Sequence, residues 1–309
     1  MERAREELAS LGVRRAMIQL PDGLRYKYEQ FSREVGVETE LWGGSCYGAC
    51  DLPWSIGDAD ALVHVGHSEI PSLKTDYPVI YVEGRSIVEN PFSVEVLQAF
   101  AGKKVALYST LQFMDQRDEI GMMLEEIGAE TVMREGDGRI RYPGQVLGCN
   151  YSCRTRADEH LFVGTGKFHP MGLSMSLKKA IHHLDPCLGT HETTGDMLER
   201  TMRKRFAAIT LSEDAGPKAL LVSKKGGQNR LSLAKEVKSK CDGCVVVHMD
   251  EITPDMVDSL GFRVAINTAC PRLALDDSLR FKTIMLTPQE HAISVKERTW
   301  DEWTMDEIV

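Results

Sequence analysis

The sequence lacks several features that would place it in other classes of protein. No run of 18 or more apolar residues occurs, so we expect no membrane-spanning helix. The N-terminus is charged and no apolar stretch follows it, which excludes a secretory signal peptide. Acidic residues outnumber basic ones, 46 to 37, and the net charge of −9 argues against direct binding of nucleic acid. The sequence therefore predicts a cytoplasmic protein.

What is present is an ordinary globular composition and a notable number of cysteines. The chain has 309 residues, of which 42% are hydrophobic and 27% charged, enough for two domains or three small ones. In a reducing compartment we expect the cysteines to be thiols, metal ligands or redox groups and not structural disulfides. The eight cysteines are Cys46, Cys50, Cys149, Cys153, Cys187, Cys241, Cys244 and Cys270.

Short apolar stretches alternate with amphipathic ones, and this pattern starts three times. The stretch 103–108 resembles 15–20, and 217–223 begins a third round. Alternating strands and helices favour parallel sheets with right-handed crossovers. We therefore predict an α/β protein of three similar domains, each a small parallel sheet flanked by helices, arranged around a pseudo-threefold axis. The predicted domains are residues 1–102, 103–215 and 216–309.

Each repeat carries one cysteine that follows a small residue at or just past a strand end: Cys50, Cys149 and Cys270. Parallel α/β units place ligand sites beyond the carboxyl ends of their strands. A small residue lets the backbone approach a bulky group. We therefore expect these three cysteines to meet in space and share one cofactor.

Other interpretations of the cysteines remain open. The pairs Cys46/Cys50 and Cys149/Cys153 could together supply four ligands to a structural metal, although this leaves Cys270 unexplained. A CxxC pair at residues 241–244 has no second pair to complete a zinc site, and we interpret it as a turn. Cys187 is interpreted as a small buried hydrophobic residue. Three thiolates leave one iron of a [4Fe–4S] cluster open, where a substrate can bind.

Several motifs taken together resemble the diphthamide-synthesis enzymes, especially the archaeal, homodimeric kind. The resemblance covers nearly the whole chain in order, and the Tyr-Gly-Ala-Cys and Ala-Cys-Pro-Arg motifs are its most specific parts. The motifs lie at residues 19–24, 46–51, 63–68, 144–149 and 269–272.

The resemblance implies a transferase that is a non-standard radical enzyme, since the CxxxCxxC motif of ordinary radical S-adenosylmethionine enzymes is absent. It implies a [4Fe–4S] cluster on Cys50, Cys149 and Cys270, with S-adenosylmethionine as co-substrate. Cleavage of the S–Cγ bond would give a 3-amino-3-carboxypropyl radical. That group would be added to C2 of a histidine on elongation factor 2, the first step of diphthamide biosynthesis. A homodimer and a reductant for the cluster are further implied partners.

Other polar and glycine positions are candidates for binding the co-substrate. Gln19, Asp22 and Gly23 form a strand-to-helix turn, which ordinary turn chemistry explains equally well. Two histidines that follow glycines in related places are candidates to bind the co-substrate or move a proton, but structural histidines are at least as common. Two glycine-containing loops offer backbone N–H groups, with weak signals. These further candidates are His67, His169, Gly164, Gly166, Gly227 and Gln228.

Two alternatives belong to different classes of function. A dehydratase or condensing enzyme of the quinolinate synthase type also uses three similar domains and a [4Fe–4S] cluster, there as a Lewis acid without S-adenosylmethionine. A non-catalytic zinc protein would use the two CxxxC pairs.

Overall fold

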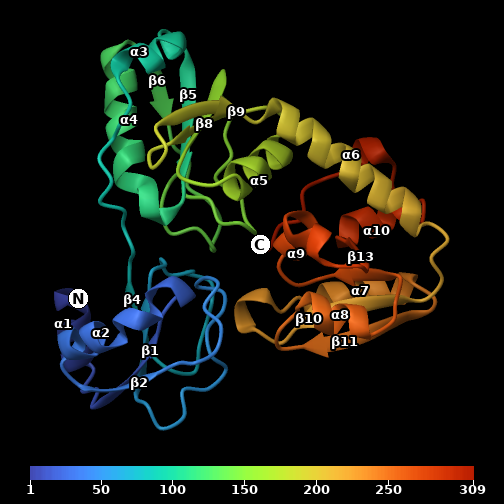
Figure 1. The fold of residues 1–309 in the computed structure, drawn as a ribbon, viewed down its shortest axis with the longest axis horizontal. Coiled ribbons are helices and arrows are strands. Elements are labelled where there is room, and N and C mark those ends of the chain that lie inside the picture. The colour runs from blue at the N-terminus through green and yellow to red at the C-terminus, as the bar shows by residue number, and fades with distance from the viewer.

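The computed structural model describes residues 1–309, and the chain forms three units around a common centre (Figure 1). Each unit is built on one sheet, and the predicted α/β class with three small sheets is confirmed. In the first unit all four strands are parallel, in the order β2-β1-β3-β4. They are β1 (Arg15–Gln19), β2 (Glu38–Leu41), β3 (Ala61–Val65) and β4 (Val79–Val82).

The second and third units repeat this strand order. The third sheet, β11-β10-β12-β13, is fully parallel, whereas the second, β6-β5-β7-β8-β9, ends in an antiparallel strand. The second-unit strands are β5 (Lys104–Ser109), β6 (Glu130–Val132), β7 (Glu159–Val163), β8 (His182–Asp185) and β9 (Thr190–Thr193). The third-unit strands are β10 (Lys218–Ser223), β11 (Cys244–Met249), β12 (Val264–Asn267) and β13 (Ile284–Leu286).

Helices cover the sheets. Figure 1 shows α4 along the second sheet, and the third sheet is covered by α7 and α10. The helices are α1 (Glu2–Ser10), α2 (Tyr28–Val35), α3 (Val94–Leu97), α4 (Met114–Glu126), α5 (Phe168–Leu177), α6 (Gly195–Ser212), α7 (Leu231–Lys240), α8 (Pro254–Ser259), α9 (Arg272–Leu275) and α10 (Pro288–Ser294). Short 3-10 turns are η1 (Asp22–Lys27), η2 (Gln98–Phe100), η3 (Leu111–Phe113), η4 (Gly226–Gln228), η5 (Asp277–Arg280) and η6 (Trp300–Glu302).

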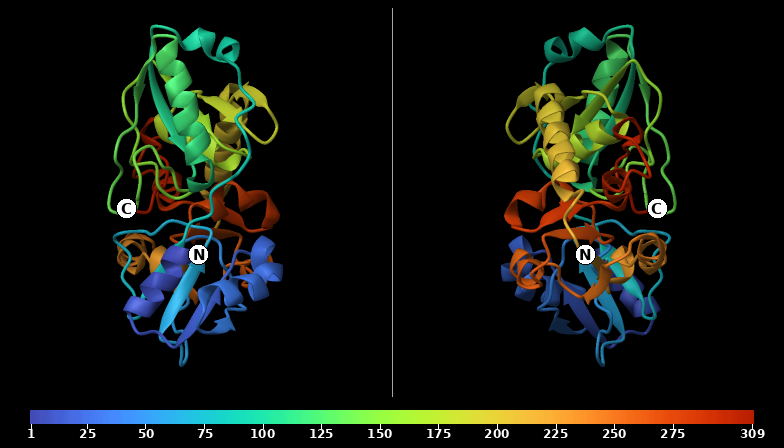
Figure 2. Two further views of the ribbon diagram at one scale, coloured as in Figure 1. Left: turned by 90° about the vertical axis from the view of Figure 1, so that its left-hand side faces the viewer. Right: turned by 90° about the vertical axis from the view of Figure 1, so that its right-hand side faces the viewer.

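Helix α6 and the C-terminal segment join the second unit to the third. In Figure 2, α6 runs down from the second unit toward the third. Its Arg205 is buried and pairs with Glu290 of α10 at 2.5 Å, while donating to the Met285 carbonyl at 2.7 Å. The C-terminal segment then returns, and Trp303 packs into a core cluster that contains residues of both the second and the third unit. These contacts fix the relative positions of the two units.

Several segments between the long elements have irregular structure. The chain after Pro21 forms the 3-10 turn η1 before α2 begins at Tyr28. Residues 145–147 make only isolated bridges, one from Gln145 to Ser109 of β5 and one from Leu147 to Asn150. Helix α3 begins at Val94. The boundaries between the domains predicted from the sequence stay predictions.

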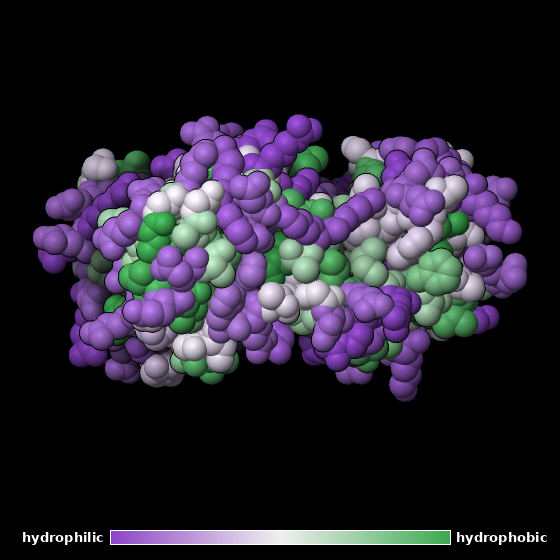
Figure 3. All heavy atoms as spheres, turned by 90° about the horizontal axis from the view of Figure 1, so that it is seen from above, coloured by the Kyte–Doolittle hydropathy of each residue, from purple (hydrophilic) through white to green (hydrophobic).

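None of the helices is both long enough and apolar enough to cross a membrane. In the view from above, hydrophilic side chains cover most of the face and apolar patches lie between them (Figure 3).

Candidate active site

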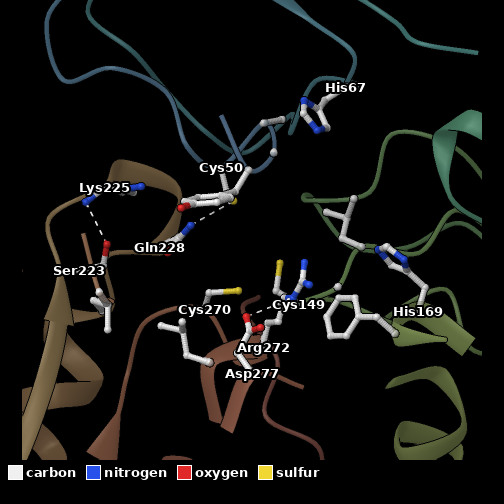
Figure 4. A pocket seen from close by; sticks show the side chains of 18 of the residues that line it. Cys50, His67, Cys149, His169, Ser223, Lys225, Gln228, Cys270, Arg272 and Asp277 are labelled. Atoms are coloured by element: carbon white, nitrogen blue, oxygen red, sulfur yellow. Dashed lines mark hydrogen bonds and ion pairs between the residues drawn. The ribbon is translucent and has the colours of Figure 1, made fainter. Parts of the chain in front are cut away.

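One cysteine from each unit reaches a shared cavity of about 460 Å³ at the centre of the molecule. Cys50 comes from the loop between β2 and β3, Cys149 from the loop between β6 and β7, and Cys270 from the segment after β12. Figure 4 shows the three side chains extending into the same space. The structure thus brings together the three cysteines that the sequence singled out. Only Cys270 closely follows a strand, whereas Cys50 and Cys149 lie well inside long loops.

The three positions are related but not identical within the repeat. Cys50 and Cys149 follow the second strand of their units, whereas Cys270 follows the third strand of its unit. The position that matches Cys270 in the first unit, the third residue after β3, is taken by Ser68. The repeat therefore supplies one cysteine per unit without strict threefold symmetry.

Two glycines near the cysteines are required by close contacts within the protein. We had expected small residues there to make room for a bulky bound group. A Cβ on Gly148 would lie 2.3 Å from a ring carbon of Phe168, and a Cβ on Gly227 would lie 2.4 Å from Cα of Cys50. A Cβ on Gly48 would meet only the Cys50 sulfur, at 3.7 Å. The small residues thus make room for close packing between neighbouring protein segments, and at Gly227 the packing joins the third unit to the first.

Two side chains direct N–H groups at cysteine sulfurs. Gln228 Nε2 lies 3.5 Å from Cys50 Sγ, and a guanidinium nitrogen of Arg139 lies 3.9 Å from Cys149 Sγ. Arg139 is buried, donates to the Gly227 carbonyl at 3.0 Å, and its Nε has no partner in the protein. A buried cation with an unpaired N–H group indicates that negative charge belongs in this space.

Without a metal, the thiols resist ionisation. Burial, followed by the neighbouring Cys50, raises the pKa of Cys149 to about 11. Burial also raises the pKa values of Cys50 and Cys270, and for Cys270 the other two cysteines add to the effect. A metal group that binds all three as thiolates would remove this penalty.

The spacing of the thiols fits a cluster better than one small ion. Tetrahedral zinc with Zn–S bonds of about 2.3 Å needs sulfurs about 3.8 Å apart. Two other groups of side chains have ligand atoms within 4.8 Å of one another, but the three cavity cysteines do not form such a group. The donor set of three thiols and a buried arginine therefore fits a multi-iron group with one iron left open.

The remaining cysteines lie elsewhere. Cys153 is fully buried and its Sγ donates to the Gln145 carbonyl at 3.1 Å, outside the cavity lining. Cys46 lies beside His64 and His67, and burial raises its pKa to about 12. Neither Cys46 nor Cys153 lines the cavity, so each CxxxC pair contributes one cysteine to it.

Two expectations about the outlying cysteines are wrong. Cys187 is exposed, not buried, because it lies in the loop between β8 and β9. Cys241 and Cys244 are joined in a disulfide, although we expected no structural disulfide. The turn between them contains Gly243 at a φ of 82°, which brings the two thiols together. His291 lies within 4.8 Å of this pair, a neighbour that the sequence did not suggest.

The predicted co-substrate contacts fall into two groups. His67, His169 and Gln228 line the cavity, and Gly227 packs behind Cys50. The others lie outside the lining: Gln19 is buried behind His64, Asp22 and Gly23 are exposed on η1, Gly164 lies against the ring of Phe162, and Gly166 is exposed. The role of all of these residues in binding the co-substrate stays a prediction.

The sequence reasoning missed several charged groups around the cavity. Lys225 bridges the first and third units, with Nζ 2.8 Å from Asp51 and 2.6 Å from Glu251. Arg272 lies over the Phe168 ring at 4.8 Å and 3.4 Å from Asp277. The Ala-Cys-Pro-Arg motif contained Arg272, and its partner Asp277 follows shortly after it in the sequence, but only the fold shows that both line the cavity.

The fold and site define a three-unit α/β protein whose central cavity offers three cysteines to a metal cluster. Residues 20–304 match a family model described as "Putative diphthamide synthesis protein". The chain therefore belongs to the diphthamide synthesis family.

Individual relatives can be aligned with this chain over nearly its full length. The chain is 34% identical to 2-(3-amino-3-carboxypropyl)histidine synthase of Pyrococcus horikoshii, over 98% of this chain and 92% of that protein. It is 24% identical to the protein of the same name from Methanocaldococcus jannaschii, over 96% and 89%. A crystal structure of Dph2 from Pyrococcus horikoshii with a 4Fe-4S cluster superimposes with a TM-score of 0.89 at 34% identity, covering 100% of this chain and 93% of that one.

Proposed function

We propose that this chain is a 2-(3-amino-3-carboxypropyl)histidine synthase. It transfers the 3-amino-3-carboxypropyl group of S-adenosylmethionine to C2 of a histidine on elongation factor 2, in diphthamide biosynthesis. The observation that carries this conclusion is the convergence of Cys50, Cys149 and Cys270 on one cavity, in a chain that matches a relative of that name over nearly its whole length. Family membership decides against the quinolinate-synthase-like and zinc-protein alternatives.

Cys50, Cys149 and Cys270 hold the [4Fe–4S] cluster in this proposal. When bound, the cluster supplies an open iron and the electron that cleaves the S–Cγ bond of S-adenosylmethionine, which yields a 3-amino-3-carboxypropyl radical and methylthioadenosine. Arg139 and Gln228 donate hydrogen bonds to two of the thiolates and stabilise their negative charge.

Charged groups of both signs on the cavity wall suit the amino-acid part of S-adenosylmethionine. Arg272 and Asp277 both line the cavity, so a carboxylate and an ammonium group each find a partner of opposite sign. The Lys225 bridge to Asp51 and Glu251 closes the side of the cavity between the first and third units. Excluding water there protects a radical from side reactions.

Elongation factor 2 is the protein substrate, and an external reductant supplies the electron. The chain acts as a homodimer, as the resemblance to the archaeal enzymes implies. Sedimentation at micromolar concentration tests this last point. A single species of 34.5 kDa would contradict the homodimer.

The decisive experiment uses anaerobically reconstituted protein, dithionite, S-adenosylmethionine and elongation factor 2. We expect methylthioadenosine in the small-molecule fraction and a 3-amino-3-carboxypropyl group on a histidine peptide of elongation factor 2. Mostly 5′-deoxyadenosine would overturn the proposed bond cleavage. No cleavage at all, with a complete cluster, would favour Lewis-acid chemistry.

A further inference from the structure

A chain of hydrogen bonds leads from the backbone of the first unit to the cavity wall. Its members are Gln19 at the end of β1, His64 in β3, and His67 just after β3. Gln19 and His64 are fully buried, whereas His67 lines the cavity (Figure 4). The direction of each bond can be deduced from the chemistry of the groups.

Gln19 has only one possible orientation. Its Nε2 donates to two backbone carbonyls, those of Ser45 at 2.9 Å and Asp51 at 2.7 Å. Carbonyl oxygens only accept, so this end of the amide must be the NH2 group. The other end, Oε1, lies 2.7 Å from His64 Nδ1 and therefore accepts a hydrogen bond from the N–H group there.

The hydrogen bond from Gln19 also fixes which ring nitrogen of His64 carries hydrogen. Burial lowers its pKa to about 3, so the ring is neutral and carries one N–H group. That N–H is at Nδ1, which leaves Nε2 as an acceptor. His67 Nδ1 lies 3.0 Å from this Nε2 and must be the donor.

His67 is therefore left with an unprotonated Nε2. Burial lowers its pKa to about 4, so it too is neutral, while nearby Asp51 acts in the opposite direction and favours the protonated ring. Nε2 makes no hydrogen bond within the protein, and His67 lines the same cavity as the three cysteines. The first unit thus presents a fixed hydrogen-bond acceptor to the cavity that also holds the three cysteines.

The proposed transfer releases one proton. A sulfonium cation and a neutral imidazole with hydrogen at C2 become a neutral thioether and a neutral imidazole with carbon at C2. The new C–C bond replaces the C–H bond, the S–Cγ bond breaks, and the hydrogen leaves as H⁺. The adduct also gives back the one electron that was used to cleave the S–Cγ bond, so the overall transfer involves no net oxidation or reduction. A base in the cavity has to accept it.

We propose that His67 Nε2 is the base that accepts the C2 proton of the acceptor histidine. His64 and Gln19 are positioning residues, because they hold His67 in the Nδ1–H form. This role rests on the proposed function and adds to it a residue for the last step. His169, which the second unit contributes to the cavity, is the competing base, but its ring packs on Phe162 and no hydrogen bond fixes its tautomer.

The first test is spectroscopic and does not depend on activity. Protein labelled with ¹⁵N at histidine, without its cluster, should show His67 with hydrogen on Nδ1 and a bare Nε2 near neutral pH. The Gln19→Leu variant removes the acceptor that fixes His64 and should lose this single tautomer. A wild-type His67 that carries its hydrogen on Nε2 would overturn the proposal.

The second test separates cleavage from transfer. His67→Gln should keep its iron and release methylthioadenosine, while modified histidine per methylthioadenosine falls about 100-fold, the scale of general-base catalysis. The control, His248→Gln, changes an exposed residue of β11 and should behave as wild type. A wild-type ratio of modified histidine to methylthioadenosine in His67→Gln would overturn the proposal. So would a lowered ratio in His169→Gln alone.

These outcomes remain distinguishable from failure of the proposed function. If wild-type protein gives neither methylthioadenosine nor modified histidine, the transfer itself is wrong. If His67→Gln loses its cluster, the glycine variant His67→Gly with added imidazole takes its place. Imidazole should then restore coupling, and a lack of restoration with the cluster intact would count against His67 as the base.

Discussion

At the scale of single residues, the centre of the molecule holds three thiols that resist ionisation. Burial comes first and the neighbouring sulfurs second in raising the pKa values of Cys149 and Cys270. Three buried thiolates are stable side by side only where a bound metal group offsets the free-energy cost of ionising them. Sequence could identify them because each follows a small residue and one occurs in each repeat, although only Cys270 closely follows a strand. It could not identify Arg139, because that residue lies in an irregular segment and reaches Cys149 only through the fold.

Replacing each proposed ligand should remove the cluster. Cys50→Ala, Cys149→Ala and Cys270→Ala should each lower bound iron and the visible cluster absorption to near background, because two thiolates hold a cluster poorly. Cys46→Ala and Cys153→Ala are matched controls from the same CxxxC pairs and should keep both signals. A control that loses its cluster while its paired variant keeps it would show that the wrong cysteine of that pair is assigned.

Arg139 should set the reduction potential of the cluster. Reduction adds negative charge beside a buried guanidinium, so removing that guanidinium disfavours the reduced state. We expect Arg139→Met to shift the midpoint potential to more negative values in a titration followed by electron paramagnetic resonance. Arg141→Met, an exposed neighbour, should leave the potential unchanged. Equal potentials in wild type and Arg139→Met would contradict this role.

At the scale of elements, the cavity depends on loops that follow regular strands. The apolar strands of all three sheets could be predicted from the sequence, because buried parallel strands are continuous apolar runs. The antiparallel β9 could not, since its residues Thr190–Thr193 are polar and largely exposed. Residues 145–147 resemble a strand in sequence, but in the structure they form only isolated bridges.

The turn η4 should be sensitive to a single methyl group at one glycine and not at its neighbour. A Cβ on Gly227 would lie 2.4 Å from Cα of Cys50, so Gly227→Ala must push the third unit away from the first. At Gly226 the nearest atom to a Cβ is a Leu73 methyl carbon at 3.8 Å, an ordinary contact. We expect Gly227→Ala to lose most of its iron and Gly226→Ala to keep it, measured after identical reconstitution. Similar iron contents in both variants would refute this contact as a requirement.

At the scale of the whole molecule, buried neutral histidines tie stability to pH. Burial is the first cause that lowers the pKa values of His64 to about 3 and of His67, His169 and His291 to about 4. An unfolded histidine titrates near 6.5, so between these values the unfolded chain binds more protons. Stability should therefore be complete above about pH 7 and fall as the pH drops from about 6.5 toward 4.

Urea unfolding of the cluster-free protein at about pH 7 and about pH 5 tests this coupling, and the midpoint should be lower at the acidic value. His291 lies away from the cavity, so its replacement isolates one group. His291→Gln should show a smaller drop than wild type between the two pH values. Identical midpoints at both pH values in the wild type would exclude this coupling.

The C-terminal segment ties two cysteine loops together across the units. Ile308 N donates to the Cys149 carbonyl at 2.8 Å. Arg230 donates to the Ala269 carbonyl at 2.9 Å, next to Cys270, and pairs with Asp306 at 2.7 Å. One buried ion pair therefore connects the segment behind Cys149 to the segment that carries Cys270.

Removing Asp306 should weaken both the fold and the cluster site. Asp306 is fully buried, so Asp306→Ala leaves Arg230 as an uncompensated buried charge, at a cost of about 3–5 kcal/mol in the free energy of unfolding. Denaturant unfolding measures that cost, and iron content after reconstitution should fall in parallel. Asp301→Ala, an exposed change on η6, is the matched control and should alter neither quantity. A destabilised Asp306→Ala that still binds iron fully would show that the C-terminal segment supports the fold without positioning the cysteines.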